Sequence, residues 1–144
     1  MELMTPELVL FDLEAGSKED VVRALAKSMN ANERLTDLEA YVADVFARET
    51  MGTTALGFRV ATPHAKSGAV QTASLAFAHL SKPIDWDGEE VDLVFQIAVP
   101  LAEAGDRHLV ILAQLARQLI HEDFRERLAF ASSPVEVVDL VGIE

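Results

Sequence analysis

Apolar and polar positions in the first third of the chain predict one strand followed by two helices. Leu8–Leu13 is a short apolar run of strand length. After it, Ser17 and the acid three residues later have the form of a capping box, and apolar residues recur at three- and four-residue spacing over 21–29. Thr36 can cap a second helix, whose apolar stripe extends over 38–46. We therefore expect a pair of helices directly after the first strand.

The pattern becomes extended in the middle of the chain. Residues 58–62 form a short predicted strand that Pro63 ends, because proline lacks an amide donor and disfavours helical angles at the residue before it. Two further apolar runs, 73–80 and 91–99, are separated by an acid-rich loop that contains proline and glycine. The second run is almost continuously apolar, which is typical of a strand buried on both faces at the centre of a sheet.

Helical spacing returns in the last third of the chain. Asp106 can cap a helix whose predicted core stripe is Leu109, Leu112, Ala113, Ala116, Leu119 and Ile120. A short helix over 124–130 follows, and a proline in the first turn opens a last helix over 134–141. The C-terminal part of the chain is thus predicted to be entirely helical.

The resulting order of elements, β-αα-βββ-ααα, predicts a three-layer α/β/α fold around a mixed sheet of about four or five strands. A length of 144 residues suits one compact domain over 1–144. Half of the residues are hydrophobic, which is enough for a core without disulfides or metals.

Composition narrows the classes of function. The net charge is −12, with the acidic residues spread along the chain, which argues against nucleic acid as a partner. The absence of cysteine excludes disulfides, thiolate metal sites and thiol nucleophiles. The N-terminus lacks the features of a secretory signal, and no apolar stretch is long enough to insert into a membrane. We therefore expect a protein of the cytoplasm.

Two of the four histidines are placed where a site is expected. His64 follows Pro63 directly after a predicted strand, and His108 lies in the first turn of a predicted helix that follows another strand. If these strands are parallel, both histidines reach the crevice at their carboxyl ends. His79 and His121 are interpreted as a surface residue and a helix-end contact, and neither is assigned a function.

The surroundings of the two histidines favour the binding of an anion. A helix N-terminus presents free amides and partial positive charge, which favour a neutral imidazole and attract phosphate. The motifs of phosphate-binding loops, dinucleotide folds, zinc proteases, serine hydrolases and calcium loops are missing from the sequence. A neutral imidazole nitrogen is itself a nucleophile that can take up a phosphoryl group and pass it on.

Several stretches of the chain occur in a specific combination around these histidines. They are Leu8-Val9-Leu10-Phe11-Asp12-Leu13, Lys18-Glu19, Arg48-Glu49, Thr54-Ala55-Leu56-Gly57, Val60-Ala61-Thr62-Pro63-His64-Ala65, Phe95-Gln96-Ile97-Ala98-Val99-Pro100 and His108-Leu109-Val110-Ile111-Leu112-Ala113-Gln114-Leu115-Ala116. In these residues the chain resembles the enzyme IIA domain of the bacterial phosphoenolpyruvate-dependent sugar phosphotransferase system, in its fructose/mannitol class. The resemblance extends over nearly the whole sequence.

The resemblance implies a role for each site residue. His64 matches the histidine that receives a phosphoryl group from the phosphocarrier protein HPr and passes it to a cysteine of the cognate enzyme IIB. His108 matches a second histidine that orients the phosphoryl group, and Arg48 matches an arginine that stabilises it. Thr54 matches a threonine near the site, although its ordinary interpretation is a turn residue. The membrane component, enzyme IIC, is an indirect partner, and no metal or cofactor is required.

One departure and three alternatives accompany the resemblance. Phe58-Arg59 stands where many members have Asn-Gly, next to the active loop; Arg59 either adds a cation or pairs with surface acid. The docking surface is expected to be apolar and to include Phe58 or Ala65.

Three alternative functions stay open. They are a nitrogen-related regulatory homologue, a small-anion hydrolase that uses His64 and His108, and a purely structural module. A fructose-type system is favoured, with mannitol and galactitol open.

Overall fold

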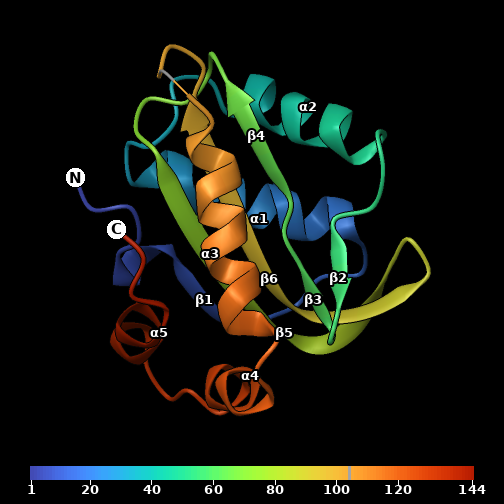
Figure 1. Ribbon diagram of the computed structural model, residues 1–144. Coiled ribbons are helices and arrows are strands. Elements are labelled where there is room, and N and C mark those ends of the chain that lie inside the picture. Colours follow the sequence, from blue (N-terminus) through green and yellow to red (C-terminus); the bar gives the residue numbers. More distant parts are fainter. Residues whose placement is uncertain (104) are drawn as a thin grey trace.

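A computed structural model describes residues 1–103 and 105–144, which form five α-helices, one 3₁₀ helix and six strands. Figure 1 shows a sheet with helices on both faces. In chain order the elements are η1 (Pro6–Leu8), β1 (Val9–Leu13), α1 (Lys18–Ala31), α2 (Leu38–Glu49), β2 (Ala55–Gly57), β3 (Val60–Ala61), β4 (His64–Ser67), β5 (Ser74–Trp86), β6 (Glu89–Pro100), α3 (Arg107–Leu119), α4 (Glu122–Ala129) and α5 (Pro134–Val141).

Strand β6 is the centre of a mixed sheet. The order along the sheet is β1-β5-β6-β3-β2, and β4 also pairs with β6. β5 and β6 form a long antiparallel hairpin, β1 is parallel to β5, and β3 and β4 are both parallel to β6. The predicted parallel arrangement of the segments before His64 and His108 is therefore present, so the two strand ends point the same way.

Two hydrophobic clusters, one on each face of the sheet, hold the three layers together. The helices of one layer contribute the buried residues Val21, Val22, Leu25, Ala26 and Met29 of α1 and Tyr41, Val42 and Val45 of α2. The opposite layer contributes Ile111, Leu115 and Leu119 of α3, Leu128 of α4, and Val137 and Val141 of α5. Along β6 the side chains alternate between the clusters, as in Val94 and Phe95, which explains its continuous apolar run. The three-layer α/β/α prediction is confirmed.

The strand count and two strand boundaries differ from the sequence-based expectation. The sheet has six strands, since the segment on the far side of β6 is divided into β2, β3 and β4. β5 continues to Trp86, so the predicted acid-rich loop is reduced to the turn at Asp87-Gly88. Pro83 lies where the pairing of β5 with β6 is irregular, between His79 and Ile84, which is the kind of position at which a strand tolerates proline.

The helix caps agree with the expectation at two of the predicted positions. The hydroxyls of Ser17 and Ser133 accept hydrogen bonds from the backbone amides of Asp20 and Glu136, as predicted for the first and last helices. The cap of α2 is Asp37, not Thr36, and its carboxylate accepts the amide of Ala40.

The buried face of α3 is also different from the predicted one. Ile111, Leu115 and Leu119 face the core, whereas Leu109 is 52 % exposed. Leu109 and Leu112 line a surface hollow, but Leu112 also packs against the core cluster, and Leu119 of the predicted stripe is buried as expected.

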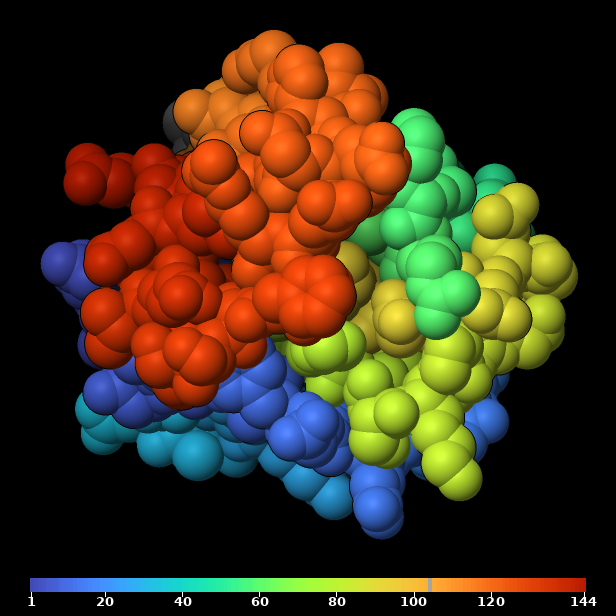
Figure 2. All heavy atoms as spheres, turned by 90° about the horizontal axis from the view of Figure 1, so that it is seen from below, coloured from blue at the N-terminus to red at the C-terminus, as the bar shows by residue number. Residues whose placement is uncertain are grey.

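The turn between β2 and β3 lies at the base of the molecule, beside α4. Figure 2 shows this face, with the turn in green next to the helix in orange. Gly57 pairs with Val60, so Phe58 and Arg59 form a two-residue turn with φ of 57° and 67°. Positive φ at both central positions is the requirement of a type I′ turn, for which Asn-Gly is favoured. The Phe58 ring packs 4.3 Å from the guanidinium of Arg125.

Candidate functional site

The His64 side chain is fixed by the strand that follows Pro63. His64 is the first residue of β4, opposite Ile97 of β6, and not part of a loop as expected from the sequence. β4 forms because the Pro63 carbonyl accepts the amide of Ile97 at 3.1 Å and returns the chain to the sheet after the missing proline donor. The residue is 7 % exposed, so burial and pairing hold it in place.

One hydrogen bond determines which nitrogen of the neutral His64 ring carries the proton. Nδ1 lies 3.0 Å from the carbonyl oxygen of Thr62. A carbonyl only accepts, so Nδ1 carries the proton and Nε2 keeps its lone pair when the ring is neutral. The geometry therefore presents Nε2 as the nucleophilic atom.

The pKa of His64 is lowered from its ordinary value of 6.5, chiefly because burial disfavours the charged ring. The positive charge of Arg48 and the neighbouring His108 lower the pKa further, while the hydrogen bond to Thr62 and the charge of Glu49 oppose the shift. Near neutral pH the ring is consequently in the uncharged, nucleophilic form.

His108 approaches His64 from the opposite layer. It is the second residue of α3, and the centroids of the two imidazole rings are 6.1 Å apart with an interplanar angle of 30°. Its Nδ1 is buried and has no hydrogen-bond partner among residues 1–103 and 105–144. An unpaired buried nitrogen costs free energy unless a ligand satisfies it. The position suits a group that bonds an oxygen close to the His64 ring.

Arg48 comes to the same place from the last turn of α2. One guanidinium nitrogen, Nη1, donates to the carbonyl of Gly52 at 3.0 Å, which holds the side chain next to its own helix end. The guanidinium has five N–H groups, so most of its donors are free for an anion.

A hollow of about 640 Å³, called here the histidine hollow, joins the three side chains. Its lining residues are Asp44, Ala47, Arg48, Met51, His64, Ala65, Lys66, Ser67, Gly68, Leu101, His108, Leu109 and Leu112. Three of them, Met51, Leu101 and Leu109, are large apolar side chains that are 80 %, 61 % and 52 % exposed. These three residues, the apolar rim, surround a polar centre of one guanidinium and two imidazoles.

Thr54 does not line the histidine hollow. It is buried, and its hydroxyl donates to the carboxylate of Glu49 at 2.5 Å. Glu49 is the residue that reasoning from the sequence missed: it is buried, and Lys18 lies 3.4 Å from its second oxygen. The Arg48-Glu49 pair drew attention to this helix end, but no sequence pattern indicated that the carboxylate turns inward.

The other sequence-based candidates lie away from the hollow. Phe58 is half-exposed at the β2–β3 turn and is not among the lining residues, whereas Ala65 is. Arg59 pairs with Glu90 at 2.6 Å and with Asp92 at 2.8 Å, so it follows the surface-acid alternative. His79 lies in β5, and His121 precedes α4 as its N-cap residue.

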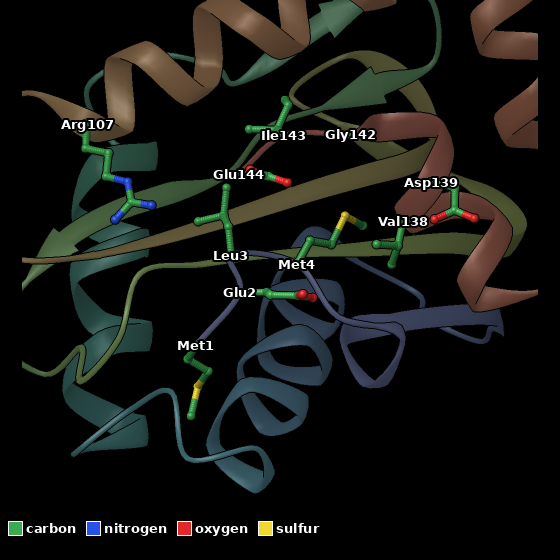
Figure 3. Close-up of a pocket in the computed structure, with 10 residues that line it drawn as sticks. All are labelled: Met1, Glu2, Leu3, Met4, Arg107, Val138, Asp139, Gly142, Ile143 and Glu144. Carbon is green, nitrogen blue, oxygen red and sulfur yellow. The ribbon is translucent and has the colours of Figure 1, made fainter.

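A second hollow of similar size lies at the chain ends. Figure 3 shows it between Met1–Met4 and the turn at 142–144, with Arg107 directed into it from α3. Its lining contains no histidine, and Arg107 is engaged with Glu103 at 3.1 Å. It therefore lacks the nucleophile that the histidine hollow provides.

Within the described part of the chain, no three His, Asp or Glu side chains gather closely enough to hold a metal ion. Across residues 1–103 and 105–144, no helix has the length and apolar character needed to cross a bilayer.

The fold and the sequence together identify the class of protein: the chain is a component of a phosphotransferase system. It belongs to the family described as phosphoenolpyruvate-dependent sugar phosphotransferase system, EIIA 2, whose model matches residues 2–142. The family resemblance carried by the motifs around His64 and His108 is thereby confirmed.

Individual relatives agree with this assignment. The chain is 37 % identical over 126 residues to a 2-O-alpha-mannosyl-D-glycerate-specific EIIABC component of Escherichia coli, covering 85 % of this chain and 19 % of that protein. It is 37 % identical over 143 residues to a fructose-specific EIIA component of Haloferax volcanii, covering 96 % and 92 %. The structure of nitrogen regulatory protein IIA-Ntr from Neisseria meningitidis superposes with a TM-score of 0.88 at 30 % identity, covering 96 % of each chain. The chain thus spans less than a fifth of the first of these relatives.

Proposed function

We propose that the protein is a phosphocarrier that accepts a phosphoryl group on His64 from phospho-HPr and passes it to a cysteine of its cognate enzyme IIB, in the cytoplasm. The observation that carries the proposal is the convergence of His64, His108 and Arg48 in one hollow, with the Nδ1 proton of His64 engaged by Thr62. Enzyme IIC of the membrane is an indirect partner.

The reaction follows from the geometry of the ring. The Nε2 lone pair of neutral His64 attacks phosphorus; the new N–P bond forms as the bond to the donor histidine breaks, and the donor nitrogen keeps that electron pair. Phosphoryl transfer is catalysed mainly by positioning and by charge stabilisation of the equatorial oxygens. Arg48 supplies positive charge and N–H donors, and the unpaired nitrogen of His108 orients an oxygen.

The second transfer uses the same groups in the opposite sense. A cysteine thiolate of enzyme IIB attacks the phosphoryl group, the N–P bond breaks, and Nε2 recovers its lone pair. The apolar rim of Met51, Leu101 and Leu109 suits brief docking of two different proteins, because exposed apolar patches on soluble domains mark interaction sites.

Phosphorylation by phosphoenolpyruvate, enzyme I and HPr tests the carrier role. Intact-mass measurement should find one phosphate adduct on the wild type and none on His64→Ala, with His121→Ala as a matched control that retains the adduct. NMR should place phosphorus on Nε2 of the ring. An adduct that persists on His64→Ala, or one on Nδ1, would contradict the proposal.

The sugar specificity is proposed from a relative. The fructose-specific EIIA component of Haloferax volcanii is matched over nearly its whole length, which favours a fructose-type system. Mannitol and galactitol systems are the alternatives. Transfer from the phosphorylated protein to purified enzyme IIB proteins of each type distinguishes them, and the fructose-type partner should be phosphorylated fastest.

A regulatory role is the second candidate function. It is favoured by the match to nitrogen regulatory protein IIA-Ntr, whose structure is similar over almost the entire chain. Under this alternative, His64 is phosphorylated in the same way but no enzyme IIB accepts the group. Failure of transfer to every enzyme IIB, combined with normal phosphorylation by HPr, would favour regulation over transport.

A further inference from the structure

A buried carboxylate lies directly behind the histidine hollow. The side chain of Glu49 is 3 % exposed. Its Oε2 accepts the hydroxyl of Thr54 at 2.5 Å, and its Oε1 lies 3.4 Å from the Lys18 ammonium. Lys18 in turn donates to Asp87 at 2.8 Å, in the turn between β5 and β6. Glu49 is therefore held from both sides, by a hydroxyl and by a cation.

The Thr54 end of this arrangement continues to the reactive ring through two backbone steps. The carbonyl of Thr54 accepts the amide of Thr62 at 3.0 Å. The carbonyl of Thr62 accepts the Nδ1 proton of His64 at 3.0 Å. Glu49 is thus linked to the imidazole by three hydrogen bonds that are joined through the covalent frames of Thr54 and Thr62, and all of these residues are buried.

Burial of a carboxylate at this place is costly for folding. A buried ion pair is commonly no more stabilising than apolar residues of the same volume, because both charges lose water. The 3.4 Å separation from Lys18 is also longer than an ideal charge-assisted hydrogen bond. The contribution of Glu49 to fold stability alone is thus a weak reason for its position.

The charge of Glu49 also needs a partner for the chemistry to proceed. The incoming phosphoryl group is negative, and a lone carboxylate beside Arg48 would weaken the positive potential of the site. Lys18, which also pairs with Asp87 at the turn between β5 and β6, compensates that charge, and neither of these two residues lines the hollow. The Glu49–Lys18 pair can therefore hold its hydrogen-bond partners in place without repelling the phosphoryl oxygens.

We propose that Glu49 is a positioning residue for His64: acting through Thr54, it fixes the Thr62 carbonyl that holds the imidazole proton on Nδ1 and leaves Nε2 free, while Lys18 balances its charge. This inference rests on the phosphocarrier function proposed above. It predicts that the series of hydrogen bonds controls the rate of the chemical step and not the docking of partners, because none of its three buried members belongs to the apolar rim.

Two variants of Thr54 separate positioning from packing. Thr54→Val keeps the shape and removes the hydroxyl, whereas Thr54→Ser keeps the hydroxyl. We expect kcat for phosphoryl acceptance to fall about 10- to 100-fold in Thr54→Val, the range for a small misplacement remote from the chemistry, with KM unchanged. Thr54→Ser should restore kcat to within about threefold of the wild type, since it restores the bond to Glu49.

Imidazole NMR of the unphosphorylated protein gives a readout that does not depend on phosphoryl transfer. In the wild type and Thr54→Ser, the His64 ring should be the Nδ1–H tautomer, and in Thr54→Val the tautomers should be mixed. Glu49→Gln should lower the titration midpoint of His64, because the charge of Glu49 raises the pKa of this ring whereas the charge of Arg48 lowers it. Glu39→Gln, an exposed glutamate of the same helix, should leave both readouts unchanged.

The possible results separate this inference from the carrier function. If Thr54→Val has the tautomer and kcat of the wild type, or if Thr54→Ser is as slow as Thr54→Val, the positioning role is wrong. If Thr54→Val is unfolded, Glu49→Gln decides: an unchanged His64 midpoint and unchanged kcat overturn the inference. If the wild type is not phosphorylated at all but the tautomer responds to Thr54→Val, the carrier function fails and the positioning role stands.

Discussion

Removal of the Arg48 guanidinium should slow phosphoryl acceptance without unfolding the protein. Arg48 is partly exposed at the end of α2, and within the protein its guanidinium donates to the carbonyl of Gly52. The residue lines the histidine hollow, and its positive charge acts on His64. The variant Arg48→Ala therefore removes a stabilising charge from the transition state and leaves the core intact.

The size of the effect follows from one hydrogen bond between charged groups. Such a bond contributes about 1.5–3 kcal/mol. Each 1.36 kcal/mol corresponds to a factor of ten, so kcat/KM for transfer from phospho-HPr should fall about 10- to 150-fold. Arg48→Lys keeps the charge but not the planar fork, and its loss should be intermediate. Arg48→Ala should also raise the pKa of His64, because the positive charge of Arg48 lowers it in the wild type.

Intact-mass kinetics at several phospho-HPr concentrations measure the change, and an NMR titration measures the pKa of His64. Arg117→Ala is the matched control, because it removes the same charge from an exposed position near the C-terminus of α3. A fall of less than about threefold in Arg48→Ala, with normal thermal unfolding, would refute the reasoning, since it lies well below one lost charge-assisted bond.

Four further outcomes are expected. Since burial lowers the pKa of His64 below 6.5, the ring stays neutral as the pH falls towards that value, and the acidic limb of the kcat/KM profile should lie below pH 6.5; a limb above it contradicts the neutral nucleophile. Leu109→Asp, on the apolar rim, should raise KM about tenfold and leave kcat nearly unchanged, measured in the same mass assay. Phe95→Ala should cost about 3–5 kcal/mol in urea unfolding, because the ring is fully buried. Replacing Phe58-Arg59 by Asn-Gly should raise the Tm by about 3 °C, since glycine at position 59 relieves about 1 kcal/mol of the cost of a left-handed angle, and an unchanged Tm would argue against strain in this turn.

The order of elements and the location of the histidines could be predicted from local patterns. Strand β6 has a nearly continuous apolar run because both faces are buried, and this is readable from the sequence alone. Pro63 fixed the end of the segment before His64, and parallel pairing with β6 brings that end towards the N-terminus of α3. These features depend on residues close together in sequence, or on the rule that the carboxyl ends of parallel strands meet at one edge of the sheet.

The features that the sequence did not predict depend on contacts between residues that are distant in sequence. Helix α3 is apolar over most of its first two turns, so its periodicity could not choose between Leu109 and Ile111 as the buried position; packing against the sheet decides. The inward turn of Glu49 depends on Lys18 and Thr54, which come from two other segments. No local sequence pattern indicates that these three side chains come into contact.

The pairing of β4 with β6 has a consequence for the order of assembly during synthesis. His64 leaves the ribosome long before Ile97, its partner in the sheet, and long before His108 of α3. The first three elements of the chain cannot form the sheet either, because β1 pairs with β5. Because non-local pairing needs both strands to be present, the His64 ring is held in the sheet only after β6 has emerged. His108 joins His64 in the histidine hollow later still, when α3 has followed β6 out of the ribosome.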